Sequence, residues 1–267
     1  MEISFVGGGV MAEALIGGVI GGHITPADRI RVSEPVEARR RYLEEKYGLK
    51  SYSSNRDVLP HADLVVLAIK PQTLPYVAPE LKEALNEGNT VVSIIAGATI
   101  KTLTGGLGHS SVIRVMPNTP AQIGQGMSVW TATDSVSEES RAGTGALLRT
   151  LGKEIYVPDE KLIDMATAVS ASGPAYVFLF IEAMIDAAVY LGIARDMART
   201  LVLQTVSGST RLVEETGRHP ADLKDMVTSP GGTTIEALKA FEDGGFRAAI
   251  FNAVNAAYEK SKALGEQ

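Results

Sequence analysis

The sequence contains no cysteine, and this absence removes several kinds of chemistry at once. Without cysteine, the 267-residue chain has no disulfide, no thiolate metal site and no cysteine nucleophile. The four histidines are far apart, and none has a second ligand-type residue at metal-binding spacing: His23, His61, His109 and His219. The sequence therefore gives no indication of a metal enzyme.

Clustered positive charge is also lacking. The formal net charge is -6 at pH 7, whereas binding to DNA or RNA requires groups of Lys and Arg side chains that replace the counterions of phosphate. The densest basic run, Arg39 to Arg41, lies in a helical pattern, where such residues usually form a solvated face. We expect no nucleic-acid partner.

The N-terminal segment lacks the features of a signal peptide or a membrane anchor. Residues 1–22 are apolar, but Glu2 stands where a signal peptide carries basic residues, and the glycines interrupt any spanning helix. The segment is better explained as a strand, a turn and a helix. We therefore expect a cytoplasmic protein that does not enter a membrane.

Short apolar runs alternate with helical patterns over the first 157 residues. The runs of strand length are EISFV, RIRVS, DLVVLAIKP, NTVVSII and SVIRVMP. The helical patterns are VEARRRYLEEKYG, which ends at Gly48, LPYVAPELKEAL, and SEESRAGTGALLRTLG, which Ser137 or a neighbour caps. This alternation predicts a parallel sheet covered by helices on both faces, a doubly wound α/β domain of Rossmann type over residues 1–157.

The remaining residues, 158–267, have no convincing strand pattern and predict an all-helical domain that begins near Pro158. The helix from Pro174 to Leu191 is apolar on nearly all faces, and only two acidic residues distinguish it from a membrane span. A domain of roughly a hundred residues has difficulty burying such a helix alone. We expect the C-terminal helices to bury one another in a homodimer; burial against the first domain alone is the alternative.

A glycine turn follows the first predicted strand. Gly7, Gly9 and Ala12 form the pattern Gly-x-Gly-x-x-Ala directly before a helix. Gly7 permits a tight turn, Gly9 lets the backbone approach a pyrophosphate, and the helix N-terminus attracts anions. The pattern and its context predict a dinucleotide site, in preference to a purely structural turn.

The second predicted strand ends at Ser33 and Glu34, the position that faces the adenosine ribose in such sites. A carboxylate there accepts from the 2′-hydroxyl of NAD and repels the 2′-phosphate of NADP. Glu34 therefore favours NADH among the two forms of NAD(P)H, whereas Ser33 and Arg39 would still suit a phosphate.

Several further motifs carry a resemblance to a known family. In order along the chain they are FVGGGVMAEAL, LAIKPQ, SIIAG, MPNTPA, SASGPAYVF, HPADLKDMVTSPGGTTIEAL and GGFRAAIFNAV. Together they resemble pyrroline-5-carboxylate reductase over essentially the whole chain. The resemblance implies hydride transfer from NAD(P)H to the ring imine of 1-pyrroline-5-carboxylate, which yields L-proline in the last step of its biosynthesis. It also implies a helical C-terminal domain that interlocks with a second subunit, often within a pentamer of dimers.

The resemblance implies the following site residues by position. The residues that match cofactor-contacting stretches are Gly7, Gly8, Gly9, Val10, Met11, Ala12, Ser33, Asn55, Ala68, Ile69, Lys70, Pro71, Ala96, Gly97 and Asn118, with Glu34 added by its place after the second strand. The residues that match the substrate loop are Ser229, Gly231, Gly232, Thr233 and Thr234. Lys70 either balances charge at the nicotinamide or is a solvated residue at a strand end.

The loop TSPGGTT suits a small anionic substrate. Its amides precede a predicted helix, so they attract the substrate carboxylate, with help from Ser229 and Thr233. The hydroxyl of Thr234 then reaches the ring nitrogen, which arrives protonated, so that orientation matters more than a strong acid. We predict Thr234 as the catalytic residue; the alternative is that one of the two threonines only caps the helix.

One alternative function is that of an imine or hydroxyacid reductase of the same architecture with a different substrate. Related hydroxyacid dehydrogenases place a lysine on the helix that opens the second domain, but residues 173–192 contain none. A second alternative is a dinucleotide-binding regulator without turnover.

His219 precedes Pro220 at a predicted helix start, which favours a capping histidine over a catalytic one. The SASGPAY turn has either a structural role or a ligand contact.

Overall fold

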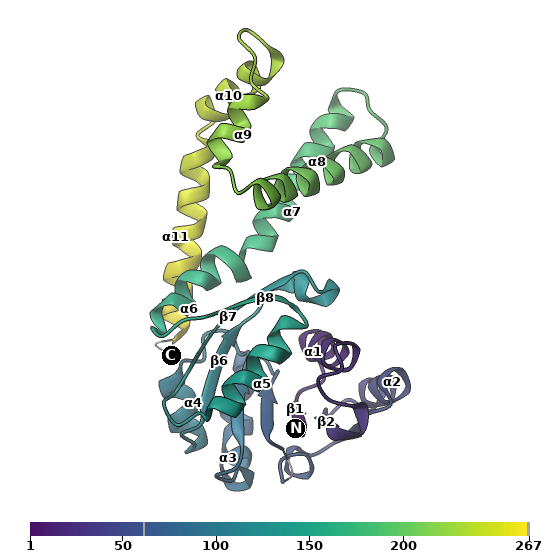
Figure 1. Cartoon of the computed structure of the whole chain (residues 1–267), viewed down its shortest axis with the longest axis vertical. Coiled ribbons are helices and arrows are strands. Elements are labelled where there is room, and N and C mark those ends of the chain that lie inside the picture. Colours follow the sequence, from purple (N-terminus) through teal and green to yellow (C-terminus); the bar gives the residue numbers. More distant parts are fainter. Residues whose placement is uncertain (61, 266–267) are drawn as a thin grey trace. The chain divides into compact units, whose positions relative to one another are not determined.

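A computed structural model describes residues 1–60 and 62–265 of the chain (Figure 1). His61, one of the four histidines considered above, and residues 266 and 267 lie outside the described residues. The chain forms two compact units. Unit 1 comprises Met1–Ser172 and Ala257–Gln267, and unit 2 comprises Gly173–Ala256.

Unit 1 is built on one eight-stranded sheet in the order β3-β2-β1-β4-β5-β6-β7-β8. The strands are β1 (Ile3–Val6), β2 (Ile30–Ser33), β3 (Lys50–Tyr52), β4 (Leu64–Leu67), β5 (Thr90–Ser93), β6 (Val112–Met116), β7 (Gly126–Ala132) and β8 (Gly152–Tyr156). The pairs from β3 to β6 are all parallel, β7 runs antiparallel to β6, and β8 runs parallel to β7. The predicted doubly wound sheet is confirmed.

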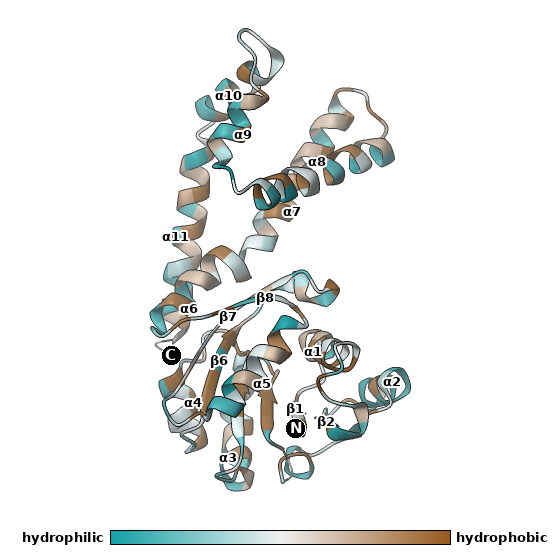
Figure 2. Ribbon diagram, viewed as in Figure 1, coloured by the Kyte–Doolittle hydropathy of each residue, from teal (hydrophilic) through white to brown (hydrophobic). Residues whose placement is uncertain are grey.

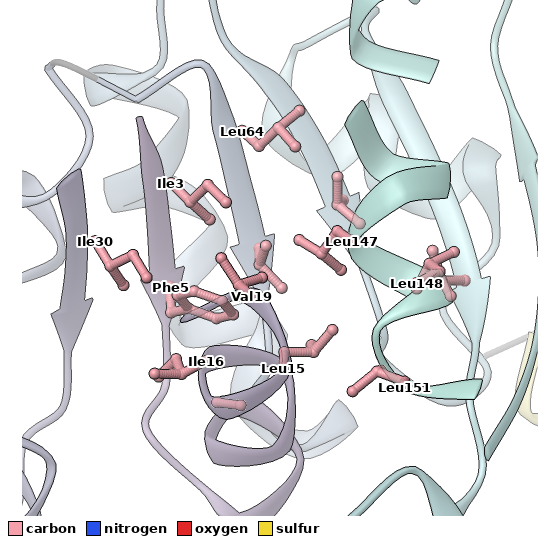
Figure 3. Packing of buried hydrophobic residues seen from close by; sticks show 14 of the residues in the cluster. Ile3, Phe5, Leu15, Ile16, Val19, Ile30, Leu64, Leu147, Leu148 and Leu151 are labelled. Atoms are coloured by element: carbon pink, nitrogen blue, oxygen red, sulfur yellow. The ribbon is translucent and has the colours of Figure 1, made fainter. Parts of the chain in front are cut away.

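Helices cover both faces of this sheet. The helices of unit 1 are α1 (Val10–Gly21), α2 (Glu37–Tyr47), α3 (Leu74–Ala84), α4 (Ile100–Leu107), α5 (Glu138–Arg149), α6 (Lys161–Ala166) and the π-helical turn η5 (Thr167–Ala171). One core cluster joins the sheet to α1, α2 and α5 (Figure 3), and a second joins it to α3 and α4. Two predicted caps are present: Gly48 ends α2 in the left-handed conformation, and the hydroxyl of Ser137 accepts from the amide of Ser140 at the start of α5.

Unit 2 is helical. It contains α7 (Gly173–Tyr190), α8 (Arg195–Thr216), α9 (Pro220–Met226), α10 (Thr233–Asp243) and the first part of α11 (Phe246–Gly265). All residues of unit 2 are described, and only Ala198 and Val202 among them are buried. Figure 2 shows hydrophobic residues distributed along α7 and α11. Unit 2 therefore leaves most of its apolar side chains without cover in the single chain.

The compact units divide the chain at a different place from the predicted boundary near Pro158. β8 ends at Tyr156 and α6 begins at Lys161, but contacts assign α6 to the sheet unit. Two ion pairs link this segment to the sheet: Arg114 on β6 is 1% exposed and binds Glu160 at 2.7 Å and Asp164 at 2.9 Å. The end of α11 joins this cluster, because the hydroxyl of Ser261 donates to Asp164 at 3.0 Å.

One helical run within the described residues has the length and composition of a membrane span. It extends from Lys161 to Tyr190, through α6, η5 and α7. Length and composition alone are weak evidence, because a helix that is covered by a second subunit has the same properties.

Candidate active site

The glycine turn lies at the point where the strand order reverses. β1 lies between β2 and β4, and ligands of doubly wound sheets bind outside the carboxyl ends of the strands at this point. Gly7 follows β1 with φ 97°, and a Cβ atom there would lie 2.7 Å from the carbonyl oxygen of Ala68. Both the backbone conformation and the close approach require glycine. The turn after β1 therefore lies directly against the residues after β4.

The N-terminus of α1 is open to a ligand. Gly9 is the N-cap residue, no side chain caps the helix, and a Cβ atom at Gly9 would meet nothing within 4 Å. Val10 is 63% exposed, whereas Ala12 is buried in the core against the sheet. The first amides of the helix can therefore receive an anion such as a pyrophosphate. In this respect the residues fit the dinucleotide that the sequence predicts.

Glu34, directly after β2, is fixed against the glycine turn. One carboxylate oxygen accepts from the amide of Gly8 at 3.0 Å, and the other accepts from the amide of Val36 at 3.0 Å. Two backbone amides therefore hold a negative charge at the position predicted to face the adenosine ribose.

Ser33 and Asn55, both predicted to contact the cofactor, lie next to each other, but Ser33 itself is only 2% exposed. Its hydroxyl donates to Oδ1 of Asn55 at 2.6 Å. Nδ2 of Asn55 in turn donates to a carboxylate oxygen of Glu80 on α3 at 3.0 Å. Sequence reasoning did not find Glu80, because it is 25 residues from Asn55 on another helix, and no local motif marks it.

Arg39, on α2, contacts the glycine turn. Its Nε donates to the carbonyl oxygen of Gly8 at 2.6 Å, and its guanidinium also pairs with Glu13 on α1. Arg39 is therefore bound by protein groups in this structure, whereas the sequence also allowed a contact between Arg39 and a phosphate.

Glu13 has several donors besides Arg39: Tyr42, Lys46 and Tyr47 on α2. Burial would raise the pKa of Glu13, but hydrogen bonds from Lys46, Arg39 and Tyr42 outweigh it and lower this pKa to about 2. Glu13 thus ties α1 to α2 as a carboxylate. It was also missed from the sequence, where it is an ordinary acidic residue in the first turn of a helix.

The other predicted cofactor residues follow the carboxyl ends of β4, β5 and β6. After β4, Ala68 and Ile69 are half-buried, whereas Lys70 and Pro71 are exposed. After β5, Ala96 is exposed, and Gly97 lies under the end of α11, where its added Cβ would be 2.9 Å from Cβ of Leu264. These positions line the edge on which the glycine turn lies.

Asn118, after β6, has both ends of its amide engaged. Its Oδ1 accepts from the amide of Met127 at 2.8 Å, and its Nδ2 donates to the carbonyl oxygen of Ser170 at 3.2 Å. Asn118 therefore holds the π-helical turn η5 against the start of β7. π-Helical turns occur frequently at functional sites, and the SASGPAY motif contains the end of this one. The predicted contact of Asn118 with the cofactor stays a prediction.

In unit 2, no hydroxyl group of the loop before α10 caps that helix. Gly232 is the N-cap residue of α10 and no side chain caps the helix, so Thr233 and Thr234 are its first two residues. Gly231 has φ 66°, and a Cβ atom at Gly232 would overlap Oγ of Ser229. Thr234 is half-buried. The alternative of a threonine N-cap is therefore wrong.

The histidine that precedes this loop does have a capping role. His219 is the N-cap residue of α9, and its Nδ1 accepts from the amide of Ala221 at 3.2 Å. This geometry favours the structural interpretation of His219 over the catalytic one.

The sheet order and the open glycine turn at its switch point define a dinucleotide-binding α/β protein. Comparison with known proteins agrees. Residues 2–97 match the family described as NADP oxidoreductase coenzyme F420-dependent, and residues 160–264 match the family described as pyrroline-5-carboxylate reductase dimerisation. The chain belongs to the pyrroline-5-carboxylate reductase family.

The individual relatives cover the whole chain. A pyrroline-5-carboxylate reductase from Synechocystis sp. is 42% identical over 267 residues, which are 100% of this chain and 99% of the relative. A solved pyrroline-5-carboxylate reductase from Coxiella burnetii has a TM-score of 0.90 at 35% identity and covers 100% of this chain and 99% of its own. The Plasmodium falciparum pyrroline carboxylate reductase with NADP bound has a TM-score of 0.91 at 34% identity, covering 99% of this chain and 98% of its own.

Proposed function

We propose that this protein reduces 1-pyrroline-5-carboxylate to L-proline with a nicotinamide dinucleotide as the hydride donor. The observation that carries the proposal is the likeness to pyrroline-5-carboxylate reductases over the full length, including the helical part. The open turn from Gly7 to Ala12, at the switch point of the sheet, supports the dinucleotide.

The cofactor end of the site divides into three groups of residues. The amides that begin α1 bind the pyrophosphate, Ser33, Glu34 and Asn55 face the adenosine ribose, and the residues after β4, β5 and β6 border the nicotinamide. When bound, the cofactor supplies the hydride that reduces the imine carbon. We infer a preference for NADH from Glu34, because its carboxylate is held in place by two amides and repels a 2′-phosphate.

The substrate end is the loop from Ser229 to Thr234. The amides at the start of α10 bind the substrate carboxylate, since no side chain of the protein caps them. The hydroxyl of Thr234 accepts a hydrogen bond from the protonated ring nitrogen and so fixes the ring for hydride transfer. Reduction of a protonated imine needs no further acid, which agrees with the absence of lysine from α7.

The helical part, residues 158–267, completes the proposal as a substrate-binding and dimerisation domain. No residue of α7 is buried in the single chain, and Phe178 and Leu179 are 61% and 66% exposed. Cover by the helices of a second copy explains this better than a bilayer, because α7 carries Glu182 and Asp186. We infer a cytoplasmic homodimer, with a pentamer of dimers as the larger assembly.

The direct test is oxidation of reduced cofactor on addition of 1-pyrroline-5-carboxylate. We expect loss of one reduced cofactor for each L-proline formed, with NADH used at least as well as NADPH. Tight NADH binding without turnover would support a regulator instead, and turnover of other cyclic imines alone would identify a different reductase.

The cofactor preference is tested by Glu34→Ala, with the exposed Glu37→Ala as the control. Removal of the repelling carboxylate is expected to improve kcat/KM for NADPH, whereas the control leaves it unchanged. A tenfold or larger preference of the wild type for NADPH that Glu34→Ala does not alter would contradict the role of Glu34.

A further inference from the structure

A line of hydrogen bonds connects the end of β2 to α3. It runs from Oγ of Ser33 to Oδ1 of Asn55 at 2.6 Å and from Nδ2 of Asn55 to Glu80 at 3.0 Å. A carboxylate accepts hydrogen bonds and cannot donate them. Glu80 therefore determines which way the Asn55 amide faces: its NH2 group points to Glu80 and its oxygen to Ser33.

This arrangement removes donors from the place where a 2′-phosphate would need them. A phosphate dianion is bound by N–H and O–H groups and by positive charge. The Ser33 hydroxyl has a single proton, and its acceptors are Oδ1 of Asn55 at 2.6 Å and the carbonyl oxygen of Phe5 at 3.3 Å. The Asn55 NH2 group makes a charge-assisted bond to Glu80. Glu34 adds a second carboxylate beside the same strand end. A ribose hydroxyl, in contrast, can donate to a carboxylate as well as accept.

We propose that Glu80 is a second determinant of dinucleotide choice, which acts through Asn55 to disfavour a 2′-phosphate on the adenosine ribose. The inference rests on the dinucleotide site of the proposed function. Glu80 is a positioning residue in this scheme, because its hydrogen bond fixes the orientation of the Asn55 amide. Its charge adds a screened repulsion of the phosphate. Its contribution is separate from that of Glu34, which is held by the backbone of the glycine turn.

The test uses two fragments that differ only in the 2′-phosphate: adenosine 5′-monophosphate and adenosine 2′,5′-bisphosphate. Their affinities for the full chain are measured by calorimetry for wild type, Glu80→Gln and Glu80→Ala. We expect the affinity ratio to shift about 3- to 10-fold toward the bisphosphate in both variants, the size of one screened charge repulsion, with the monophosphate affinity unchanged. The ratio of kcat/KM for NADPH over NADH should shift in parallel through KM, with kcat unaltered.

The matched control is Glu87→Gln, which removes the same charge. Glu87 is exposed and precedes β5. It therefore lies near the amino ends of the parallel strands, whereas the glycine turn lies at their carboxyl ends. We expect no change in the ratio for this variant. Added salt should weaken the discrimination of the wild type more than that of Glu80→Gln, because only the wild type retains the full repulsion.

An affinity ratio in both Glu80 variants equal to that of Glu87→Gln would overturn the inference. The fragments also separate this result from the proposed reaction. If the fragment ratio shifts but 1-pyrroline-5-carboxylate is not reduced, the role of Glu80 stands and the proposed substrate is wrong. If neither fragment binds to the wild type, the dinucleotide site and the role of Glu80 are both wrong.

Discussion

At the residue scale, the proposed chemistry depends most on the hydroxyl group of Thr234. The helix that begins at Thr233 is not capped by a side chain, so the hydroxyls of Thr233 and Thr234 are not needed to start it. The proposed role of Thr234 therefore does not compete with a capping role.

Thr234→Ala is expected to lower turnover about 10- to 100-fold, the effect of losing an orienting hydrogen bond of roughly 1.4 to 2.7 kcal/mol. NADH affinity should not change, and Thr234→Ser should recover most of the rate. Steady-state kinetics and NADH titration measure both. The control is Thr210→Ala, because the Thr210 hydroxyl only donates to the carbonyl oxygen of Val206 within α8. Wild-type turnover in a folded Thr234→Ala protein would refute the catalytic assignment.

The charged form of Glu13 contributes to the stability of the fold against acid. Its pKa is lowered from 4.5 to about 2 in the folded chain, so its charge stabilises the fold fully above the ordinary pKa. This stabilisation is lost as the pH falls from about 4.5 toward 2. The free energy of unfolding of Glu13→Gln should therefore vary less over this acid range than that of the wild type, and it should be lower at neutral pH.

The measurement is urea unfolding at a series of pH values, followed by the fluorescence of Trp130, the one tryptophan of the sequence. Trp130 is buried in the same core cluster as α1. Glu45→Gln, on the exposed side of α2, is the control. If the free energy of unfolding has the same pH dependence in Glu13→Gln and wild type, the residues around Glu13 do not stabilise its carboxylate.

At the scale of the elements, the turn from β1 to α1 has a backbone geometry that requires glycine at position 7. Gly7→Ala puts a side chain at φ 97° and 2.7 Å from the carbonyl oxygen of Ala68. We expect a loss of more than about 1 kcal/mol of stability and a large loss of NADH affinity. Gly21→Ala, at the other end of α1, is the matched control, because its Cβ would meet nothing within 4 Å. Calorimetric binding in the Gly7 variant equal to that of the Gly21 variant would contradict the role of the turn.

The elements also show what a sequence can and cannot predict. β1, β2, β4, β5 and β6 were predicted because a strand covered on both faces is a continuous apolar run. β3 has three residues, and β8 reads GKEIY with much of it exposed, so neither gives such a run. The glycine turn was predictable because backbone geometry requires a residue type there. Glu13 and Glu80 were not, because their partners on α2 and η2 (Asn55–Asp57) become neighbours only in the folded sheet unit.

At the scale of the whole molecule, unit 2 predicts the oligomeric state. Its helices leave large apolar side chains uncovered, among them Phe251, which is 76% exposed. Light scattering should give at least twice the 28.2 kDa of one chain, without detergent. Phe251→Glu should weaken the assembly, whereas Tyr76→Glu, at an 84% exposed position on α3, should not. A stable and active 28.2 kDa protein would refute the dimer.

The path of α11 has a consequence for the order in which the protein is made. Unit 1 includes the segment from Ala257, in which Ser261 donates to Asp164 and Leu264 lies against Gly97. The ribosome adds this segment only after all of unit 2, so the sheet unit waits for its final contacts while unit 2 is already emerging. Domains usually fold in the order of their synthesis. Here the unit that begins first is completed last, and a nascent chain stalled before residue 257 holds a cofactor edge without its α11 support.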